Sequence, residues 1–328
     1  MIRRPFDSIL LALALATAVL LAACGGGAAA QSPSTLTLDW AYYNPTSLVL
    51  RHHGWLEDEL AADGIEVAWV QSAGSNKAIE FLNSGSVQFG STAGAAALLA
   101  RVAGSPIRSI YAYSQPEWTA LVTLEDSGIQ SVEDLAGKRV AVTRGTDPHI
   151  FLVRALADHD LSEDDIESVL LQHADGRNAL VSGQVDAWAG LDPMMAEAEL
   201  EQGARLFYRA ADLNTWGILN VNEEFAAQHP DLVEKVIAAY ERGREWALAN
   251  PDELAQILAE AAGLSIEVAE AQLARTSFTT PALGDAQYES ILGAGEALQQ
   301  AGEIGADVDV PAVLDDLFDP TFTTDLEG

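Results

Sequence analysis

The alternation of short apolar runs with helical patterns between Thr35 and Asn222 constrains the fold of this chain more than any other feature. Short apolar runs bounded by turn residues are typical of strands, whereas apolar residues spaced three and four apart predict helices. Alternating strands and helices favour βαβ units, so we predict an α/β fold built on largely parallel sheets. After Asn222 only helical spacing recurs, which predicts an all-helical tail.

The pattern places ten strands and eleven helices along the chain. The predicted strands are Thr35–Trp40, Ile65–Val70, Val87–Phe89, Ile107–Tyr113, Trp118–Leu124, Arg139–Val142, Val169–Gln172, Val185–Ala189, Arg205–Tyr208 and Ile218–Val221. The predicted helices are Thr46–Ala62, Asn76–Asn83, Ala93–Ala103, Pro148–Ala157, Gly176–Val181, Pro193–Glu201, Pro230–Leu248, Asp252–Ala262, Ile266–Thr276, Asp285–Ala301 and Pro311–Leu317.

Changes of composition near Leu124 and Asn214 indicate that a middle segment is inserted into a first lobe. The chain would cross between the lobes twice, and these crossings would form a hinge. Because open α/β sheets bind ligands outside the carboxyl ends of their strands, we expect a ligand cleft between the lobes. The predicted lobes are residues 35–122 together with 214–328, and residues 123–213.

The N-terminal residues predict an exported lipoprotein. Two arginines precede an apolar run over residues 9–23, which is shorter than the roughly twenty residues that span a bilayer. The end of this run and the two residues after it, Leu-Ala-Ala-Cys-Gly at residues 21–25, resemble the lipobox of bacterial lipoproteins. We predict a signal peptide over residues 1–23, lipidation of Cys24 and a lipid-anchored linker over residues 24–34. The protein would then lie in the cell envelope, in the periplasm or on the outer face of the cytoplasmic membrane.

Charge and motif content argue against several classes of function. The chain has 17 Lys and Arg against 49 Asp and Glu, a formal net charge of -32, so no nucleic-acid partner is expected. The single cysteine excludes an intramolecular disulfide and a Cys-based metal centre, and the six histidines form no H-E-x-x-H or H-x3-H pair. Glycine-rich nucleotide motifs and the G-x-S-x-G nucleophile elbow are absent. We therefore predict no metal, no cofactor and no enzymatic activity.

Four predicted strand-to-helix loops are rich in small or hydroxylated residues. Each loop would place unpaired backbone N–H groups at a helix N-terminus, where the helix dipole favours an anion. The acidic protein repels an anion over a Debye length of about 8 Å, but converging amides act at contact distance. Alternatively, the Ser, Thr, Asn and Asp side chains cap their own helices. The four loops are Tyr42–Thr46, Gln71–Asn76, Gly90–Gly94 and Thr143–Pro148.

The last of these loops contains a conflict between two roles. Asp147 precedes Pro148 and is a good helix cap, so its carboxylate would compete with an anion for the same amides, unless it meets a cationic ligand group. If Asp147 caps the helix, the anion must use the amides of Gly145 and Thr146. Arg144 would suit two oxygens of the anion, and it is equally suited to pair with surface carboxylates.

The most specific motif lies at residues 175–193. Asp-Gly-Arg-Asn-Ala is followed there by Gly-Gln-Val-Asp-Ala-Trp-Ala-Gly-Leu-Asp-Pro. Together with Gly-Thr-Asp-Pro at residues 145–148 and Asn-Thr-Trp-Gly at residues 214–217, this stretch resembles substrate-binding proteins of the nitrate/sulfonate/taurine group of ABC importers. It looks most like the aliphatic-sulfonate branch.

The resemblance implies a two-lobe periplasmic-binding-protein fold of type II with extra C-terminal helices. It implies a solute receptor that closes on a small organosulfonate and presents it to the transmembrane subunits of a permease. We expect a monomer, with no partner besides this solute, the permease and the membrane. Trp118, Trp188 and Trp216 would be apolar walls or core residues, and Asp192 would orient an amide or meet an amine. The predicted ligand-binding residues are Tyr42, Ser72, Gly74, Ser91, Thr92, Ala93, Trp118, Arg144, Gly145, Thr146, His149, Trp188, Asp192 and Trp216.

Three alternatives stay open at this point. The same fold would bind taurine, nitrate or a neutral nitrogenous compound, and an acidic residue in the pocket would suit taurine. An enzyme acting on a pyrimidine or a phosphate ester would need a nucleophile, a metal or an acid–base pair, none of which has recognisable spacing here. The pyrimidine relatives carry a cysteine-rich motif that this chain lacks. The third alternative is an interaction protein with a vestigial cleft.

Overall fold

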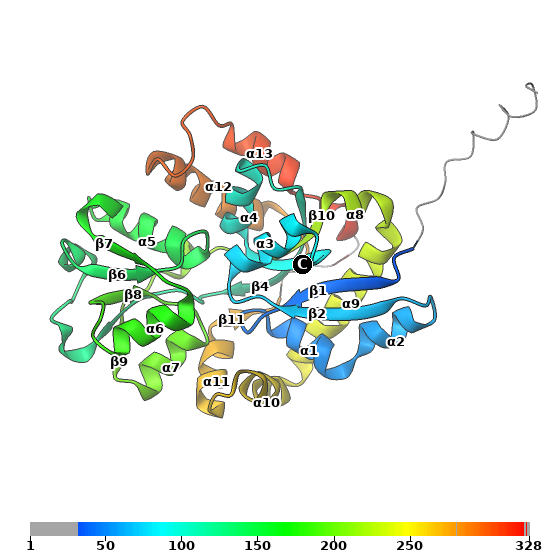
Figure 1. The fold of residues 1–328 in the computed structure, drawn as a ribbon, viewed down its shortest axis with the longest axis horizontal. Coiled ribbons are helices and arrows are strands. Elements are labelled where there is room, and N and C mark those ends of the chain that lie inside the picture. Colours follow the sequence, from blue (N-terminus) through cyan, green and yellow to red (C-terminus); the bar gives the residue numbers. More distant parts are fainter. Residues whose placement is uncertain (1–31, 280, 325, 327–328) are drawn as a thin grey trace, which may run out of the picture. The chain divides into compact units, whose positions relative to one another are not determined.

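Two separate mixed sheets organise the part of the chain that the structure describes, which is residues 32–279, 281–324 and 326 of a computed structural model (Figure 1). The six-stranded sheet contains β1 (Thr35–Trp40), β2 (Glu66–Gln71), β3 (Phe89–Ala93), β4 (Ile107–Pro116), β10 (Gly217–Asn222) and β11 (Thr276–Ser277). The five-stranded sheet contains β5 (Leu121–Leu124), β6 (Arg139–Val142), β7 (Glu167–Leu170), β8 (Ala187–Ala189) and β9 (Ala204–Tyr208). The predicted signal peptide and Cys24 lie outside the described residues.

The strand pairings show where the chain passes between the sheets. β1 pairs in parallel with β2 and β3, and β6 pairs in parallel with β7 and β8. The chain leaves the six-stranded sheet after β4 and returns through β10, and β5 and β10 both run antiparallel to their neighbours. The two crossing segments contact each other, since the backbone N–H of Thr119 donates to Oδ1 of Asn214 at 2.9 Å.

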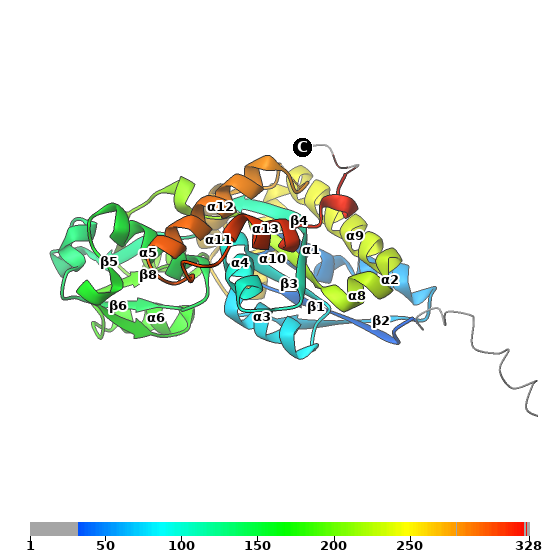
Figure 2. The ribbon, with the colours of Figure 1, turned by 90° about the horizontal axis from the view of Figure 1, so that it is seen from above.

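Helices surround both sheets. Along the chain to residue 201 they are α1 (Pro45–His53), α2 (Trp55–Ala61), α3 (Ser75–Ser84), α4 (Gly94–Val102), α5 (Asp147–Asp158), α6 (His173–Val181) and α7 (Met194–Glu201). The later helices are α8 (Glu223–Gln228), α9 (Pro230–Ala249), α10 (Pro251–Ala262), α11 (Ile266–Ala274), α12 (Asp285–Gln300) and α13 (Val310–Leu317). α1 packs against α9 and α10, whereas α4 packs against α12 and α13 (Figure 2). None of the helices within the described residues has the length and apolar character needed to cross a membrane.

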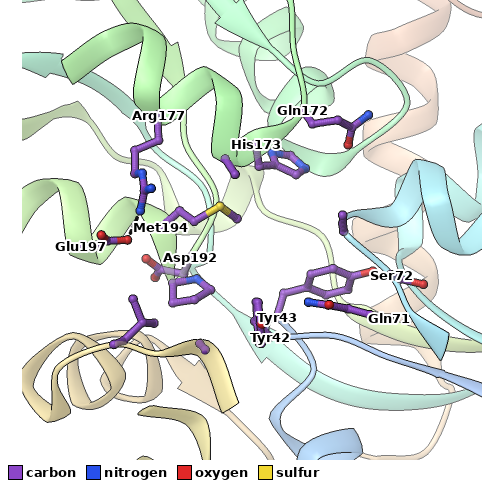
Figure 3. Close-up of a pocket in the computed structure, with 15 residues that line it drawn as sticks. Tyr42, Tyr43, Gln71, Ser72, Gln172, His173, Arg177, Asp192, Met194 and Glu197 are labelled. Carbon is purple, nitrogen blue, oxygen red and sulfur yellow. Dashed lines mark hydrogen bonds and ion pairs between the residues drawn. The ribbon is translucent and has the colours of Figure 1, made fainter. Parts of the chain in front are cut away.

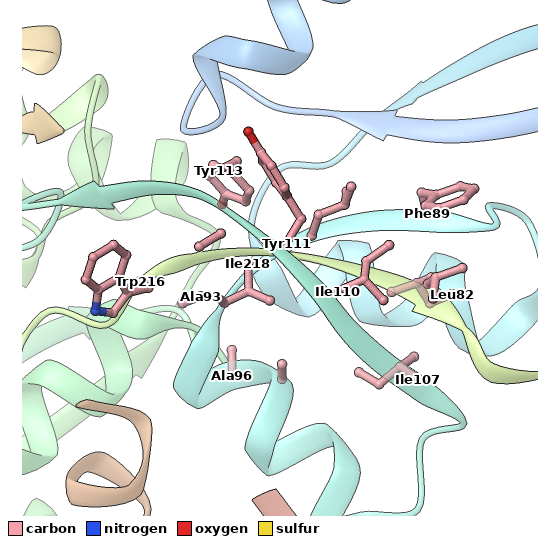
Figure 4. Close-up of a cluster of buried hydrophobic side chains, with 14 of the residues drawn as sticks. Leu82, Phe89, Ala93, Ala96, Ile107, Ile110, Tyr111, Tyr113, Trp216 and Ile218 are labelled. Atoms are coloured by element: carbon pink, nitrogen blue, oxygen red, sulfur yellow. The ribbon is translucent and has the colours of Figure 1, made fainter. Parts of the chain in front are cut away.

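The largest core lies on the six-stranded sheet. Tyr111 and Tyr113 of β4, Ile218 of β10 and Phe89 of β3 are fully buried together (Figure 4). At 25 cal/mol per Å² of apolar surface, burying one such side chain stabilises the fold by about 2 kcal/mol. Separate buried clusters lie on the five-stranded sheet, so each sheet has a core of its own.

The α/β class is confirmed. The prediction that the sheets are largely parallel is wrong, because four of the strand pairings within the described residues are parallel and five are antiparallel. Three local expectations are also wrong. The helix predicted over Thr46–Ala62 is interrupted at Gly54, whose φ of 66° ends α1 and whose N–H donates to the carbonyl of Leu50. The tail is not all helical, because β11 pairs antiparallel with β4 at the edge of the six-stranded sheet. The strand predicted to end at Gln172 ends at Leu170, and α6 begins at His173.

Candidate ligand-binding site

A cavity of about 270 Å³ is lined by loops and helix ends that follow strands of both sheets (Figure 3). The six-stranded sheet contributes the segments after β1 and β2, and the five-stranded sheet contributes α6 and the start of α7. The segment after α10 completes the wall. The lining residues are Tyr42, Tyr43, Gln71, Ser72, Ala73, Gln172, His173, Ala174, Arg177, Asp192, Pro193, Met194, Glu197, Ala262 and Leu264.

α6 begins in the wall of this cavity, and α3 begins two residues after the lining residue Ala73. α3 begins at Ser75 and α6 begins at His173, and neither helix has a side-chain cap. The backbone N–H groups of Ser75 and Asn76 in α3 and of Ala174 in α6 donate no hydrogen bond within the described residues. A helix N-terminus with unpaired N–H groups binds anions. Uncharged donors for an anion therefore lie in the cavity wall at the start of α6 and beside the cavity at the start of α3.

The charged side chains of the wall are paired with each other. Arg177 donates to Glu197 through Nη1, and its Nη2 donates to Oδ1 of Asn178 at 3.1 Å. The buried Nε of Arg177 has no partner among the described residues, so one N–H of the guanidinium stays available to a ligand. The wall thus offers one additional cationic donor besides the two helix ends.

Asp192 belongs both to the cavity and to a pair that lies behind it. Its Oδ1 accepts from the backbone N–H of Ala196 at 2.9 Å in the first turn of α7. Both carboxylate oxygens lie 3.4 Å from Nη1 of Arg275, which follows α11. Burial raises the pKa of Asp192 to about 7, against the opposing effect of Arg275. Asp192 is therefore held by its neighbours without any ligand group.

His173 is the first residue of α6 and lines the cavity with a buried side chain. Its side chain is 1% exposed, and Nδ1 lies 3.1 Å from Oγ1 of Thr143. Burial lowers the pKa of His173 to about 3, so the ring is neutral. Nε2 has no partner among the described residues, and a Cβ built on Gly74 would lie 2.9 Å from it. Gly74 therefore allows α6 to approach the loop before α3.

A second, narrow cavity of about 10 Å³ adjoins the first at Tyr43 and His173. Trp118 and Thr146 line it, and Nε1 of Trp118 donates to Oδ2 of Asp147 at 2.8 Å. Asp147 also accepts from the backbone N–H of Thr215 at 2.9 Å and from its Oγ1 at 2.6 Å. Asp147 was expected to cap a helix or to contact the ligand, and both expectations are wrong. Its carboxylate instead joins the start of α5 to the two crossing segments, through Trp118 and Thr215.

The loop before α4 does not present the free amides that the sequence predicted. Ser91 donates to Asp39 through both its backbone N–H and its hydroxyl, each at 2.8 Å. Thr92 accepts from Asn220 at 2.8 Å, and the N–H of Ala93 donates to Oγ of Ser75 at 3.0 Å. These three residues therefore hold neighbouring elements together.

The remaining predicted residues lie at different distances from the cavity. Tyr42, Ser72 and Asp192 line it, and Gly74 lies beside it. Trp188 is fully buried on the five-stranded sheet, and Trp216 belongs to the core of the six-stranded sheet (Figure 4).

Arg144, Gly145 and His149 do not line the cavity. Gly145 has a φ of 75°, and a Cβ built on it would lie 3.8 Å from Cβ of Asn76. Arg144 lies 3.4 Å from Glu163 and 3.5 Å from Glu303, and Nε2 of His149 lies 3.3 Å from Glu163. His149 and the two glutamates have the donor types of a metal site, but Arg144 is already paired with both carboxylates.

Of the fifteen lining residues, the sequence analysis predicted only Tyr42, Ser72 and Asp192. Among the polar residues that it missed, Gln71 was treated only as part of a loop, and Gln172, His173, Arg177 and Glu197 were given no role. The available signal was the pair Gln172-His173 directly after an apolar run and before Ala-Asp-Gly, which is the composition of a strand-to-helix turn. Assigning Gln172 to the strand concealed this turn.

The family can be identified by comparison with known proteins. The family model described as NMT1/THI5 like matches residues 47–254, more than half of the chain. The chain belongs to the NMT1/THI5-like family. This NMT1/THI5-like chain is 28% identical over 255 residues to a putative aliphatic sulfonates-binding protein from Escherichia coli strain K12, with 77% of this chain and 79% of that protein covered.

A second relative of this NMT1/THI5-like chain is named as an enzyme. It is the 4-amino-5-hydroxymethyl-2-methylpyrimidine phosphate synthase of Legionella pneumophila, 27% identical over 242 residues, with 70% and 74% of the two chains covered. Among solved structures, the alkanesulfonate-binding protein SsuA from Xanthomonas axonopodis pv. citri bound to MOPS matches with a TM-score of 0.79 and 25% identity. The match covers 87% of this chain and 99% of that chain. The predicted periplasmic-binding-protein fold and the likeness to the aliphatic-sulfonate branch are confirmed.

Proposed function

We propose that this protein is the substrate receptor of an ABC importer and that it captures a small organosulfonate between two lobes. One observation carries the proposal: two uncapped helix N-termini, one after a strand of each sheet, lie in the wall of one cavity and directly beside it. A sulfonate is a tetrahedral anion with three equivalent oxygens, and it can accept from α3, from α6 and from Nε of Arg177 together. The similarity to sulfonate-binding relatives supports the same ligand class.

The lobes of the proposed receptor are residues 35–122 with 214–328, and residues 123–213. Support comes from the strand pairings, because the chain passes between the sheets only at β4 to β5 and at β9 to β10 within the described residues. Opening about these crossings would separate Gly74 from His173, which lie next to each other in this structure, and closure would bury the bound ligand. The closed receptor would then be recognised by the transmembrane subunits of the permease.

The proposed receptor is exported as a monomer and remains attached to the membrane through lipid on Cys24. The supporting features are the apolar run over residues 9–23 and the lipobox-like sequence at its end. We propose no catalytic activity for it. Sulfonate capture needs only donors in fixed positions, and the charged side chains of Arg177 and Glu197 in the cavity wall are paired with each other.

Ala174 allows a direct test of the anion site, because it lines the cavity in the first turn of α6. An Asp at this position is favourable for the helix and unfavourable for a bound anion. We expect Ala174→Asp to fold normally and to bind ethanesulfonate at least tenfold more weakly by titration calorimetry. Ala174→Asn is the matched neutral control and should bind nearly as well as the natural protein. Equal affinities for ethanesulfonate in the two variants, or binding of a hydroxymethylpyrimidine in place of any sulfonate, would contradict the proposal.

A further inference from the structure

The hydrogen bonds around His173 fix which ring nitrogen carries the proton. Oγ1 of Thr143 donates its single proton to the carbonyl of Leu171 at 2.8 Å, because a carbonyl can only accept. The same Oγ1 lies 3.1 Å from Nδ1 of His173 and is therefore the acceptor there. Nδ1 of the neutral ring thus carries the hydrogen, and Nε2 carries a lone pair.

Nε2 of His173 is an unsatisfied acceptor in the wall of the ligand cavity. The side chain is almost completely buried, and Nε2 has no partner within the described residues. Figure 3 shows the ring pointing from the start of α6 toward the loop that carries Ser72, and Gly74 of that loop lies next to Nε2. A second buried acceptor without a partner, Oε1 of Gln172, lies on the same turn. A buried acceptor that stays unpaired is costly, so this part of the wall favours a hydrogen-bond donor.

A sulfonate oxygen is the wrong group for this position. Sulfonate oxygens only accept hydrogen bonds, so their lone pairs and that of Nε2 repel each other. The donors that suit the sulfonate are elsewhere in the wall, at Nε of Arg177 and at the amides of α3 and α6. The ligand therefore needs different chemistry at the end that faces His173.

We propose that His173 determines which sulfonates are bound, by accepting a hydrogen bond from a hydroxyl or ammonium group on the carbon chain of the ligand. This inference rests on the proposed function and names the ligand class within it. A site built to pair with a ligand O–H or N–H rejects the analogue that lacks this group, because its own acceptor is then left buried without a partner. Plain alkanesulfonates of the same length are the analogues that should be rejected.

Two ligands of equal charge and nearly equal size provide the test. Titration calorimetry on the full-length protein compares ethanesulfonate with 2-hydroxyethanesulfonate, and we expect about tenfold tighter binding of the hydroxylated ligand. In His173→Phe the ring is kept and both nitrogens are lost, so the preference should fall to less than about twofold. Circular dichroism checks that the variant is folded.

Thr143→Val provides an independent test that keeps the imidazole. Removing Oγ1 takes away the acceptor that holds the proton on Nδ1, so the ring can place its proton on Nε2 and donate to the ligand. We expect the preference for 2-hydroxyethanesulfonate to shrink at least threefold in this variant. An undiminished preference in both variants would show that His173 does not select the ligand.

The outcomes separate this inference from the proposed function. Tight binding of both sulfonates with equal affinity overturns the role of His173 and leaves the receptor function supported. Absence of binding by either sulfonate overturns the receptor function as proposed.

Calorimetry in two buffers of different ionisation enthalpy detects proton uptake. Uptake of one proton with ethanesulfonate would mean that a protonated His173 contacts the sulfonate itself, which also overturns the inference.

Discussion

The carboxylate of Asp192 and the guanidinium of Arg275 lie 3.4 Å apart behind the ligand cavity. Asp192 precedes α7, next to the five-stranded sheet, whereas Arg275 follows α11 and directly precedes β11 of the six-stranded sheet. The pair therefore joins the wall of the cavity to the tail of the chain. Arg275 also pairs with Glu199, so one cation serves two carboxylates.

Asp192 should make the protein less stable as the pH rises. Its pKa is raised from 3.8 to about 7 by burial, so the folded state holds a proton that the unfolded state has already released. Stability is lost between pH 4 and pH 7 in this case, by up to about 4 kcal/mol. Asp192→Asn does not titrate in this range. Denaturant unfolding from pH 4 to pH 8 should show a larger decrease for the natural protein, and parallel pH profiles would contradict the assignment.

Gly74→Ala should weaken ligand binding without unfolding the protein. The added Cβ would lie 2.9 Å from both Nε2 of His173 and Oδ1 of Asn76, so α6 and the loop before α3 must separate. We expect at least a tenfold loss of affinity for a sulfonate by calorimetry.

Gly293→Ala is the matched control, because nothing lies within 4 Å of a Cβ at that helical position. It should increase the free energy of unfolding by about 0.5–1 kcal/mol and leave the affinity unchanged. Equal affinities of the Gly74 and Gly293 variants would show that the close approach of His173 is not needed for binding.

Asp147→Ala should be strongly destabilising. The carboxylate is 1% exposed and accepts three hydrogen bonds, from Trp118 and twice from Thr215. Its removal leaves three buried donors without an acceptor, which should lower the free energy of unfolding by about 3 kcal/mol. Trp118→Phe removes only one of these donors and should cost less. In guanidinium denaturation, Asp147→Ala should have a lower unfolding midpoint than Trp118→Phe. A lower midpoint for Trp118→Phe would refute the assignment.

Cys24→Ala should release the protein from membranes. Cys24 is the only cysteine of the chain and lies in the lipobox-like sequence. We expect the natural protein to sediment with membranes after a high-salt wash and the variant to stay in the soluble fraction. The natural protein and the variant share the predicted signal peptide, so their distributions can be compared directly. Sedimentation of the variant with the membranes would rule out the lipid anchor.

Much of the fold follows from local patterns. Thr35–Trp40 and Arg139–Val142 have the predicted bounds because turn residues or a change of polarity end each apolar run. The end of β7 could not be predicted in this way. It is set by parallel pairing with β6, where Val142 faces Leu170, and this register depends on residues far away in the sequence.

The candidate site was predicted in its principle and only partly in its residues. Helix ends that follow strands do line the cavity, and Ser72 and Asp192 are among its walls. Ser91 satisfies the same sequence criterion, but buried Asp39 takes both its N–H and its hydroxyl. In the sequence, Asp39 is one polar residue in an alternating strand. Its hydrogen bonds from Ser91 can be recognised only when the pairing of β1 with β3 is known.

A crystal structure of the complex with 2-hydroxyethanesulfonate tests the central claim most directly. The account predicts sulfonate oxygens within hydrogen-bond distance of backbone nitrogens at the starts of both α3 and α6, with the hydroxyl facing Nε2 of His173. A sulfonate held by one sheet alone, or bound away from both helix ends, would contradict the account.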